Sequence, residues 1–295
     1  MNKIIMHINY GEVAQNSYGS RMIDDICAVA ANIGFDGIEF RGSLPKELAS
    51  LSFREYAEQI AKEKKKYGLS RIMFGIGVAG CTGVTAEERK KVISGAVEQA
   101  YIASELCGTT LCNVWTSNFK STIPTAAAQS YEFHGSAAAT PEAWEEYVYT
   151  FKCIGNELEK LGVRLALETH MNRIHDVPAA CKKFVDLIDS PMIGLNMDYG
   201  NTVYFPERPS VEQTIDLYGD KLFYVHLKNS VSVPGTQMRM PTSLSGGEIN
   251  HREYFKKLCD VGFEGPIGIE APRPGDRILY AKEDFEYFKS ITTSL

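Results

Sequence analysis

The sequence predicts an α/β protein folded as a single (β/α)8 TIM barrel over residues 1–295. Short β-rich runs alternate with longer stretches of helical spacing, the pattern of βα units around a parallel sheet. Eight such units can be counted, and no Gly/Ser- or Pro-rich linker divides the chain. The 44% hydrophobic and 23% charged residues suit one ordinary globular domain with a sizeable core.

The strands are expected where short runs of apolar and β-branched residues lie between turn signals. The first begins at Ile4, in an apolar run that also carries His7. The second strand and the last strand each follow a similar turn, at residues 34–37 and 262–265. In both turns two glycines flank a Phe and an acidic residue. The eight expected strands are Ile4–Asn9, Gly37–Arg41, Arg71–Ile76, Leu111–Trp115, Arg164–His170, Ile193–Asp198, Leu222–Lys228 and Pro266–Ala271.

A helix is expected after each strand, and three segments show the helical spacing most clearly. These are Arg21–Asn32, Phe53–Tyr67 and Pro141–Leu161. Two βα connections are unusually long, Thr116–Thr140 after the fourth strand and Asn229–Asn250 after the seventh. Such connections lie on the active-site face of a barrel, so both are predicted to form walls or lids of a pocket.

Charge and composition exclude several classes of function. The net charge is −6 and the longest basic run is Lys64–Lys66, so the sequence predicts no nucleic-acid partner. No stretch approaches the ~20 apolar residues of a membrane span, and the start of the chain lacks a signal-peptide core. The seven cysteines show no CxxC pair, which favours free thiols and a cytoplasmic location. The chain has no GxGxxG or P-loop motif for a nucleotide cofactor.

The last four strands each end in residues that can bind a metal. Side chains alternate along a strand, so Glu168 and His170 share one face of the fifth strand. The same alternation places Asp198 at the end of the sixth strand, His226 with Lys228 in the seventh, and Glu270 in the eighth. The carboxyl ends of barrel strands converge on one pocket, where small residues such as Ala166, Gly194 and Gly268 lie in the layers below.

This convergence predicts one divalent-metal site formed by three carboxylates and one imidazole. The ligands would be Glu168, Asp198, His226 and Glu270. An oxygen-rich set suits Mn²⁺ first, with Co²⁺, Mg²⁺ or Zn²⁺ as alternatives. Each residue taken alone could equally be structural, as a helix cap or a buried strand histidine, but four successive strand ends favour the metal site.

With these residues in view, the chain resembles the xylose isomerase-like TIM-barrel superfamily of sugar isomerases and epimerases. That superfamily also includes inosose dehydratase, 3-dehydroshikimate dehydratase and endonuclease IV. The resemblance implies a metal held by Glu, Asp, His and Glu on strands five to eight. The motifs that carry it are Phe35-Asp36-Gly37-Ile38-Glu39, Leu165-Ala166-Leu167-Glu168-Thr169-His170, Gly194-Leu195-Asn196-Met197-Asp198, Tyr224-Val225-His226-Leu227-Lys228-Asn229 and Gly268-Ile269-Glu270.

Two reactions follow from the resemblance. In its sugar epimerases two metal-bound glutamates act on opposite faces of the substrate, which implies that Glu168 and Glu270 move a proton next to a carbonyl. The first prediction is therefore a metal-dependent isomerase or epimerase of a keto-sugar or related polyol. The Glu-Thr-His motif is shared with 3-dehydroshikimate dehydratases, in which the histidine is the base. The alternative is therefore a lyase, a dehydratase or an enzyme cleaving a 3-keto C-glycoside, with His170 as acid or base.

The two activities that are disfavoured are DNA repair and xylose isomerisation itself. Endonuclease IV relatives bind a zinc cluster through additional histidines, whereas this chain has six histidines and an acidic balance. Xylose isomerase uses two metals, and only one site can be assigned here. A third reading, a barrel that serves as a binding or partner-dependent subunit without turnover, is opposed by the intact ligand set.

Six further residues at or near the strand ends are expected to bind substrate. Lys228 could stabilise an oxyanion or lie at the pocket rim. Glu39 and Arg41 either bind hydroxyls or pair with each other, and Trp115 either stacks on a sugar or packs in the core. His7 and Asn201 are expected by position alone. The expected partner is a small carbohydrate-like molecule, and a homo-oligomer or a partner subunit is compatible with the sequence.

Overall fold

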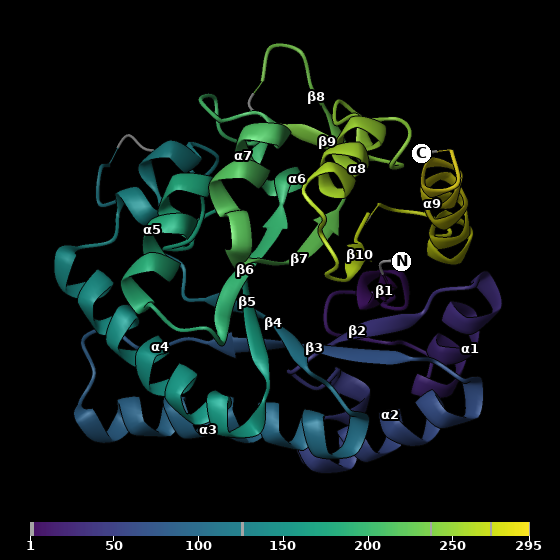
Figure 1. Cartoon of the computed structure of the whole chain (residues 1–295), viewed down its shortest axis with the longest axis horizontal. Helices are drawn as coiled ribbons and strands as arrows, with labels where there is room; N and C mark the ends of the chain where they lie inside the picture. The colour runs from purple at the N-terminus through teal and green to yellow at the C-terminus, as the bar shows by residue number, and fades with distance from the viewer. Residues whose placement is uncertain (1–2, 125–126, 237, 272, 295) are drawn as a thin grey trace.

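A computed structural model of the chain shows a closed barrel of eight parallel strands surrounded by helices (Figure 1). It describes residues 3–124, 127–236, 238–271 and 273–294. Residues 125–126 and 237, which belong to the two long connections, lie outside the described residues. The strands follow the order β1-β10-β7-β6-β5-β4-β3-β2 around the barrel, so the predicted fold is confirmed. The barrel strands are β1 Ile4–His7, β2 Gly37–Arg41, β3 Arg71–Val78, β4 Leu111–Thr116, β5 Arg164–Glu168, β6 Ile193–Asp198, β7 Leu222–Leu227 and β10 Ile267–Ile269.

In the described part of the chain, eight longer helices surround this barrel. Sequence signals set their ends: α2 starts with a capping box of Ser52 and Glu55, and α4 starts with Thr140 as N-cap and Pro141 in its first turn. The helices are α1 Ile23–Ile33, α2 Phe53–Tyr67, α3 Ala86–Cys107, α4 Pro141–Leu161, α5 Pro178–Ile188, α7 Val211–Tyr218, α8 His251–Asp260 and α9 Arg277–Thr292. One short helix, α6 Tyr199–Thr202, directly follows β6. In the described part of the chain, no helix is both long and apolar enough to cross a membrane.

Several predicted strands end earlier in the structure than the sequence suggests. β1 stops at His7, and residues Ile8–Tyr10 form a 3-10 helix, η1. β5 stops at Glu168 and β10 at Ile269, so His170 and Glu270 lie beyond their strands. The polar residues at these ends turn towards the cavity instead of continuing the ladder, which hydrophobic periodicity cannot reveal.

Two apolar layers hold the barrel. The larger one lies between strands and helices and includes Leu165 and Leu167, on the face of β5 opposite Glu168. The smaller one fills the barrel interior with Ile5, Met73, Leu111, Ala166, Phe223 and Tyr224. The small residues predicted below the site make this filling possible: a Cβ on Gly194 would collide with the Phe223 ring, and one on Gly268 with the Tyr224 hydroxyl.

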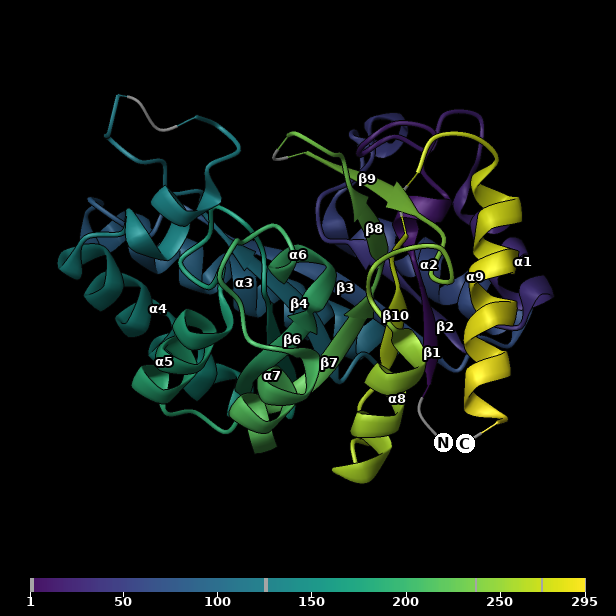
Figure 2. The same ribbon diagram turned by 90° about the horizontal axis from the view of Figure 1, so that it is seen from above.

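The two long connections rise from the carboxyl-terminal face of the barrel, where Figure 2 shows both at the same side of the molecule. The first contains two 3-10 helices, η3 Tyr131–Phe133 and η4 Gly135–Ala137. The second contains a hairpin, β8 Asn229–Ser232 paired antiparallel with β9 Arg239–Thr242. The sequence predicts only a long connection here, because the mixed residues of these two short strands lack the apolar alternation that indicates a strand.

Candidate active site

Four potential metal ligands meet at the carboxyl-terminal end of the barrel. Glu168 and Asp198 are the last residues of β5 and β6, His226 lies in β7, and Glu270 follows β10. One ligand atom from each lies within 4.8 Å of the corresponding atoms of the others. The His226 Nδ1 atom lies 3.3 Å from Glu270 Oε2, 3.9 Å from Asp198 Oδ2 and 4.0 Å from Glu168 Oε2. The structure therefore brings together the four residues that the strand ends predict.

The donor set fits a divalent cation. His226 Nε2 donates to Glu39 Oε2 at 2.8 Å, so Nδ1 is the ring nitrogen that faces the other three residues. Burial disfavours a charge on His226, but Glu39 and the other carboxylates outweigh it and raise the pKa of His226, and a bound cation would take the place of the proton on Nδ1. That Nδ1 atom is buried and has no hydrogen-bond partner among the described residues, although three carboxylates surround it. An orphaned nitrogen facing carboxylate oxygens is a costly arrangement unless a cation binds there. Burial also raises the pKa of Asp198 to about 7, whereas a bound cation would keep that carboxylate ionised.

Asparagine side chains hold the carboxylates in place. Asn113 Nδ2 donates to Glu168 Oε2 at 2.8 Å, and Asn9 Nδ2 donates to Glu270 Oε1 at 2.6 Å. Asn201 Nδ2 lies 2.9 Å from Asp198 Oδ2 and 3.3 Å from Glu168 Oε1. These amide donors fix the direction of the carboxylates without adding charge, as outer-shell partners of metal sites do.

Lys228 is the one lysine in contact with this cluster among the described residues. Its Nζ atom lies 2.7 Å from Asp198 Oδ2 and 3.5 Å from Glu270 Oε2. Burial disfavours its charge, but Asp198 and Glu270 outweigh that cost and raise the pKa of Lys228. The ammonium group therefore offsets part of the negative charge of the cluster and lies ready to donate to an oxygen bound beside it.

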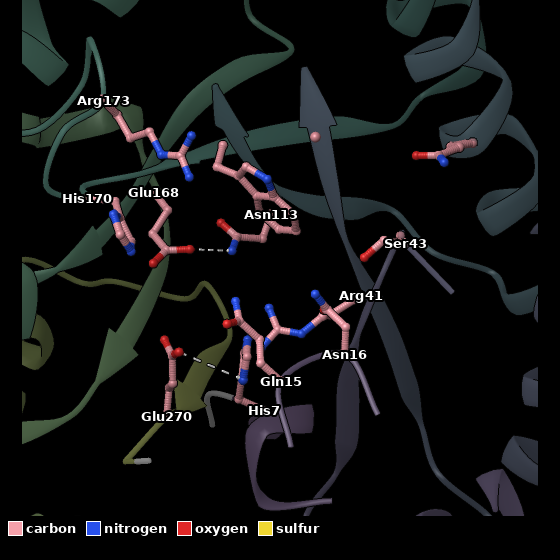
Figure 3. Close-up of a pocket in the computed structure, with 14 residues that line it drawn as sticks. His7, Gln15, Asn16, Arg41, Ser43, Asn113, Glu168, His170, Arg173 and Glu270 are labelled. Atoms are coloured by element: carbon pink, nitrogen blue, oxygen red, sulfur yellow. Dashed lines mark hydrogen bonds and ion pairs between the residues drawn. The ribbon is translucent and has the colours of Figure 1, made fainter. Parts of the chain in front are cut away.

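Two cavities adjoin the cluster. The first has a volume of about 490 Å³ and is lined by Glu168, His170 and Glu270 together with His7, Arg41 and Trp115 (Figure 3). Trp115 lies flat along this wall because β3 carries glycines there: a Cβ on Gly75 would come within 2.5 Å of its ring. The second, of about 270 Å³, lies beneath the hairpin and is lined by residues that include Tyr204, Lys228 and Pro241. His170 and Glu270 line both cavities, so they stand where the two spaces meet.

One hydrogen bond sets the tautomer of the His170 ring. Its Nδ1 atom bonds the Met171 carbonyl oxygen at 3.0 Å, which places the ring proton on Nδ1. Its Nε2 atom then carries a lone pair and has no hydrogen-bond partner among the described residues. Burial lowers the pKa of His170, against the opposing effect of Glu168, so the imidazole is neutral at physiological pH.

The match to a family of known proteins agrees with this geometry. The sequence model for the xylose isomerase-like TIM barrel matches residues 27–291. The chain belongs to this family. The curated relatives include the inosose dehydratase of Clostridium perfringens (strain 13 / Type A), 24% identical over 176 residues, which cover 54% of this chain and 59% of that enzyme.

Other relatives of this xylose isomerase-like chain carry different activities in their names. A mannonate dehydratase of Streptococcus equi subsp. zooepidemicus is 24% identical over 173 residues, covering 56% of this chain and 46% of that enzyme. A 3-oxo-isoapionate decarboxylase of Pectobacterium atrosepticum is 33% identical over 86 residues, covering 29% of each. The chain thus spans about half of the first curated relatives it matches, and their activities do not transfer to it directly.

Solved structures show the same fold over the whole chain. The probable 3-DHS dehydratase AsbF of Bacillus anthracis has a TM-score of 0.74 at 17% identity, covering 97% of this chain and 98% of AsbF. A xylose isomerase-like TIM barrel protein of Mycobacterium smegmatis, solved with magnesium, has a TM-score of 0.73 at 19% identity. The match covers 100% of this chain and 97% of that protein. The D-allulose 3-epimerase of Methylomonas sp., in complex with D-allulose, has a TM-score of 0.72 at 16% identity. The match covers 98% of this chain and 96% of that enzyme.

The other residues predicted to bind substrate take different positions in this xylose isomerase-like barrel. Arg41, Trp115 and His7 line the larger cavity, and Asn201 lines the smaller one. Arg41 pairs with Glu12, its Nε 2.8 Å from Glu12 Oε1, so the structure does not form the pairing of Arg41 with Glu39 that was one of the two alternatives. Glu39 does not line either cavity, because its carboxylate is directed at His226 and at the Tyr224 hydroxyl 2.7 Å away.

Sequence reasoning missed several residues of the site. Asn113 could have been found, because it shares the inward face of β4 with Trp115. Asn9 lies in η1 after the strand has ended, and Glu12 in the turn beyond it, so the alternation of a strand does not reach them. Arg173 lines the larger cavity from the loop after β5, where no periodic signal exists.

Proposed function

We propose that this protein is a metal-dependent lyase that acts on a polyhydroxylated carbonyl compound. It removes the proton from the carbon next to the carbonyl and expels an oxygen substituent from the following carbon. The observation that carries the proposal is the neutral imidazole of His170, a residue that lines both cavities and whose Nε2 atom makes no hydrogen bond with the described residues. The dehydratases and the decarboxylase among the relatives support a lyase by their names.

His170 transfers the proton in this reaction, and Lys228 stabilises the negative charge that develops. His170 Nε2 takes the proton from carbon, the carbon–carbon double bond forms, and the carbon–oxygen bond to the leaving group breaks. The protonated imidazole then gives that proton to the departing oxygen, so a hydroxyl leaves as water and His170 returns to its neutral form. Lys228 donates to the substrate oxygen on which negative charge develops.

Glu168, Asp198, His226 and Glu270 would hold the metal, with Mn²⁺ the first expectation and Co²⁺, Mg²⁺ or Zn²⁺ as alternatives. When bound, it would supply a Lewis acid for the carbonyl oxygen and a neighbouring hydroxyl. The magnesium complex of the Mycobacterium smegmatis relative is consistent with a hard divalent ion in this fold. The amide donors from Asn9, Asn113 and Asn201 would keep the carboxylates oriented through turnover.

An isomerase or epimerase is the second candidate, and the placement of the two glutamates favours it. Figure 3 shows the carboxylates of Glu168 and Glu270 pointing towards each other from different walls of the cavity. A substrate held between them could lose a proton to one carboxylate and regain one from the other, with no leaving group. The epimerases among the solved structures support this reading by their names.

The test compares the wild type with His170→Ala on four substrates taken from the relatives' names: an inosose, D-mannonate, 3-dehydroshikimate and D-allulose. A lyase releases water, and the variant keeps Mn²⁺ binding while kcat falls by about 100-fold or more. An epimerase takes up deuterium from heavy water with no loss of water, and the variant changes mainly KM. A metal-loaded wild type that forms neither kind of product from any of the four would contradict both candidates.

A further inference from the structure

Arg173 brings a positive charge to the wall of the larger cavity. It ends a turn that starts at His170, in which the Arg173 N–H donates to the His170 carbonyl oxygen at 3.3 Å. Asn172 has a positive φ of 65°, which asparagine tolerates in such turns. Figure 3 shows the Arg173 side chain reaching from this turn towards the space beside Asn113 and Glu168.

Among the described residues, this charge forms no ion pair with a carboxylate, and Glu168 acts on it only through the longer-range electrostatic field. The Arg173 Nη1 atom donates to the Thr116 carbonyl oxygen, and that is the one hydrogen bond of the guanidinium with the described residues. Its Nε atom is buried without a partner among the same residues. Burial lowers the pKa of Arg173, yet a guanidinium remains charged under all physiological conditions.

Among the described residues that line the two cavities, the other Arg and Lys side chains are already paired. Arg41 makes two hydrogen bonds with the Glu12 carboxylate, at 2.8 Å and 3.1 Å. Lys228 contacts Asp198 and Glu270. A partly desolvated charge without a counter-ion is unfavourable, and an anion that enters with the ligand removes this cost.

We infer that Arg173 binds a carboxylate group of the substrate, so that the substrate class is a hydroxylated acid. The inference rests on the proposed function, since it places this carboxylate in the same cavity as the reacting carbons. The planar guanidinium matches a carboxylate and keeps unused donors after its bond to Thr116. A single unpaired cation suits one carboxylate better than a phosphate, whose second charge would lack a partner.

The cavity suits the rest of such a molecule. Gln15, Asn16, Ser43 and Gln99 also line it, and all four offer neutral donors and acceptors for hydroxyl groups. Figure 3 shows Gln15, Asn16 and Ser43 across the cavity from Arg173. The volume of about 490 Å³ fits a compact ligand of the size of a sugar acid. The acid would therefore lie with its carboxylate at Arg173 and its hydroxyls along the opposite wall.

The test measures the preference of the Mn²⁺-loaded protein for an acid over its neutral counterpart. The probes are D-mannonate against D-mannitol and shikimate against methyl shikimate, with affinities determined by calorimetry. The wild type should bind each acid about 10-fold or more tightly than its neutral counterpart, and Arg173→Gln should remove that preference. Arg173→Lys should keep part of it, because the charge remains.

Arg208→Gln is the matched control, because Arg208 also donates to one backbone carbonyl, that of Phe205, and lies outside both cavities. It should leave the preference unchanged. If Arg173 only fastens the loop at Thr116, Arg173→Gln will weaken acid and neutral probes equally, and the inference is wrong. The inference is also wrong if the wild type binds the acid and its neutral counterpart equally, or binds neither. It is likewise wrong if inorganic phosphate displaces the acid probe better than acetate does. The product test of the wild type and His170→Ala does not depend on these affinities, so failure of this inference can be told apart from failure of the proposed function.

Discussion

At the scale of single residues, the state of His226 depends on Glu39. The two side chains come from β7 and β2, which are not neighbours in the sheet, and meet inside the barrel at 2.8 Å. Glu39 also accepts a hydrogen bond from Tyr224, and its side chain is buried. It therefore fixes the ring orientation and keeps the proton on Nε2, which leaves Nδ1 as the ligand atom.

We expect Glu39→Gln to weaken Mn²⁺ binding by about 10- to 100-fold, because the neutral amide no longer fixes the tautomer of His226. The dissociation constant is measured by calorimetry, and the thermal midpoint of the metal-free protein is recorded beside it. Glu146→Gln, which breaks an ion pair with Arg89 away from the site, is the control. A metal affinity within twofold of the wild type would show that Glu39 does not position His226.

At the scale of elements, the long connection between β4 and α4 is fastened to the loop after β5. The Phe119 N–H donates to the Asn172 carbonyl oxygen at 2.7 Å, and the Ser136 N–H donates to Asp176 Oδ2 at 3.1 Å. Asp176 is buried, and its Oδ1 atom has no partner among the described residues. Burial raises the pKa of Asp176 to about 6, so an ionised Asp176 at neutral pH opposes folding.

Replacing Asp176 with Asn should therefore stabilise the protein at pH 7.5. The folded state binds the carboxyl proton more tightly than the unfolded state, so the wild type loses stability as the pH rises from about 4 to about 6. An amide keeps the acceptor for Ser136 and cannot ionise, and its advantage at pH 7.5 should reach about 2–3 kcal/mol. Urea unfolding at pH 4 and pH 7.5 measures the difference, with Asp186→Asn on α5 as the control for lost charge. A variant that is less stable at pH 7.5, or equally affected at both pH values, would contradict this account.

At the scale of the whole molecule, the metal site joins four strands of the barrel. Glu168, Asp198, His226 and Glu270 come from β5, β6, β7 and the end of β10, which follow one another in the sheet. A cation bound there stabilises only the closed barrel, because the unfolded chain does not bring these residues together.

Mn²⁺ at 100 times its dissociation constant should thus stabilise the protein by about 2.7 kcal/mol. In a chain of this size that corresponds to a rise of about 5 °C in Tm, which EDTA should reverse. His226→Ala should keep the fold and lose the rise, because three carboxylates remain without the imidazole. A wild type whose Tm is the same with Mn²⁺ and with EDTA would argue against the metal site.

The sequence by itself determined the barrel and the four residues that meet at its end. Alternating hydrophobic runs are a local property of the chain, and a strand's period of two decides which side chains face inward. The ends of β2, β6 and α2 follow from such local signals, as do the positions of Glu168, Asp198 and His226.

Only the tertiary structure decided what lies around these residues. The pairing of Arg41 with Glu12, the contact of Asn9 with Glu270 and the hairpin over the second cavity join segments that no periodic pattern connects. The unpaired charge of Arg173 also becomes visible only when the loop after β5 and the end of β4 are placed side by side. Such contacts depend on how the closed barrel brings its loops together, and loop conformation is set by these long-range partners instead of by local sequence.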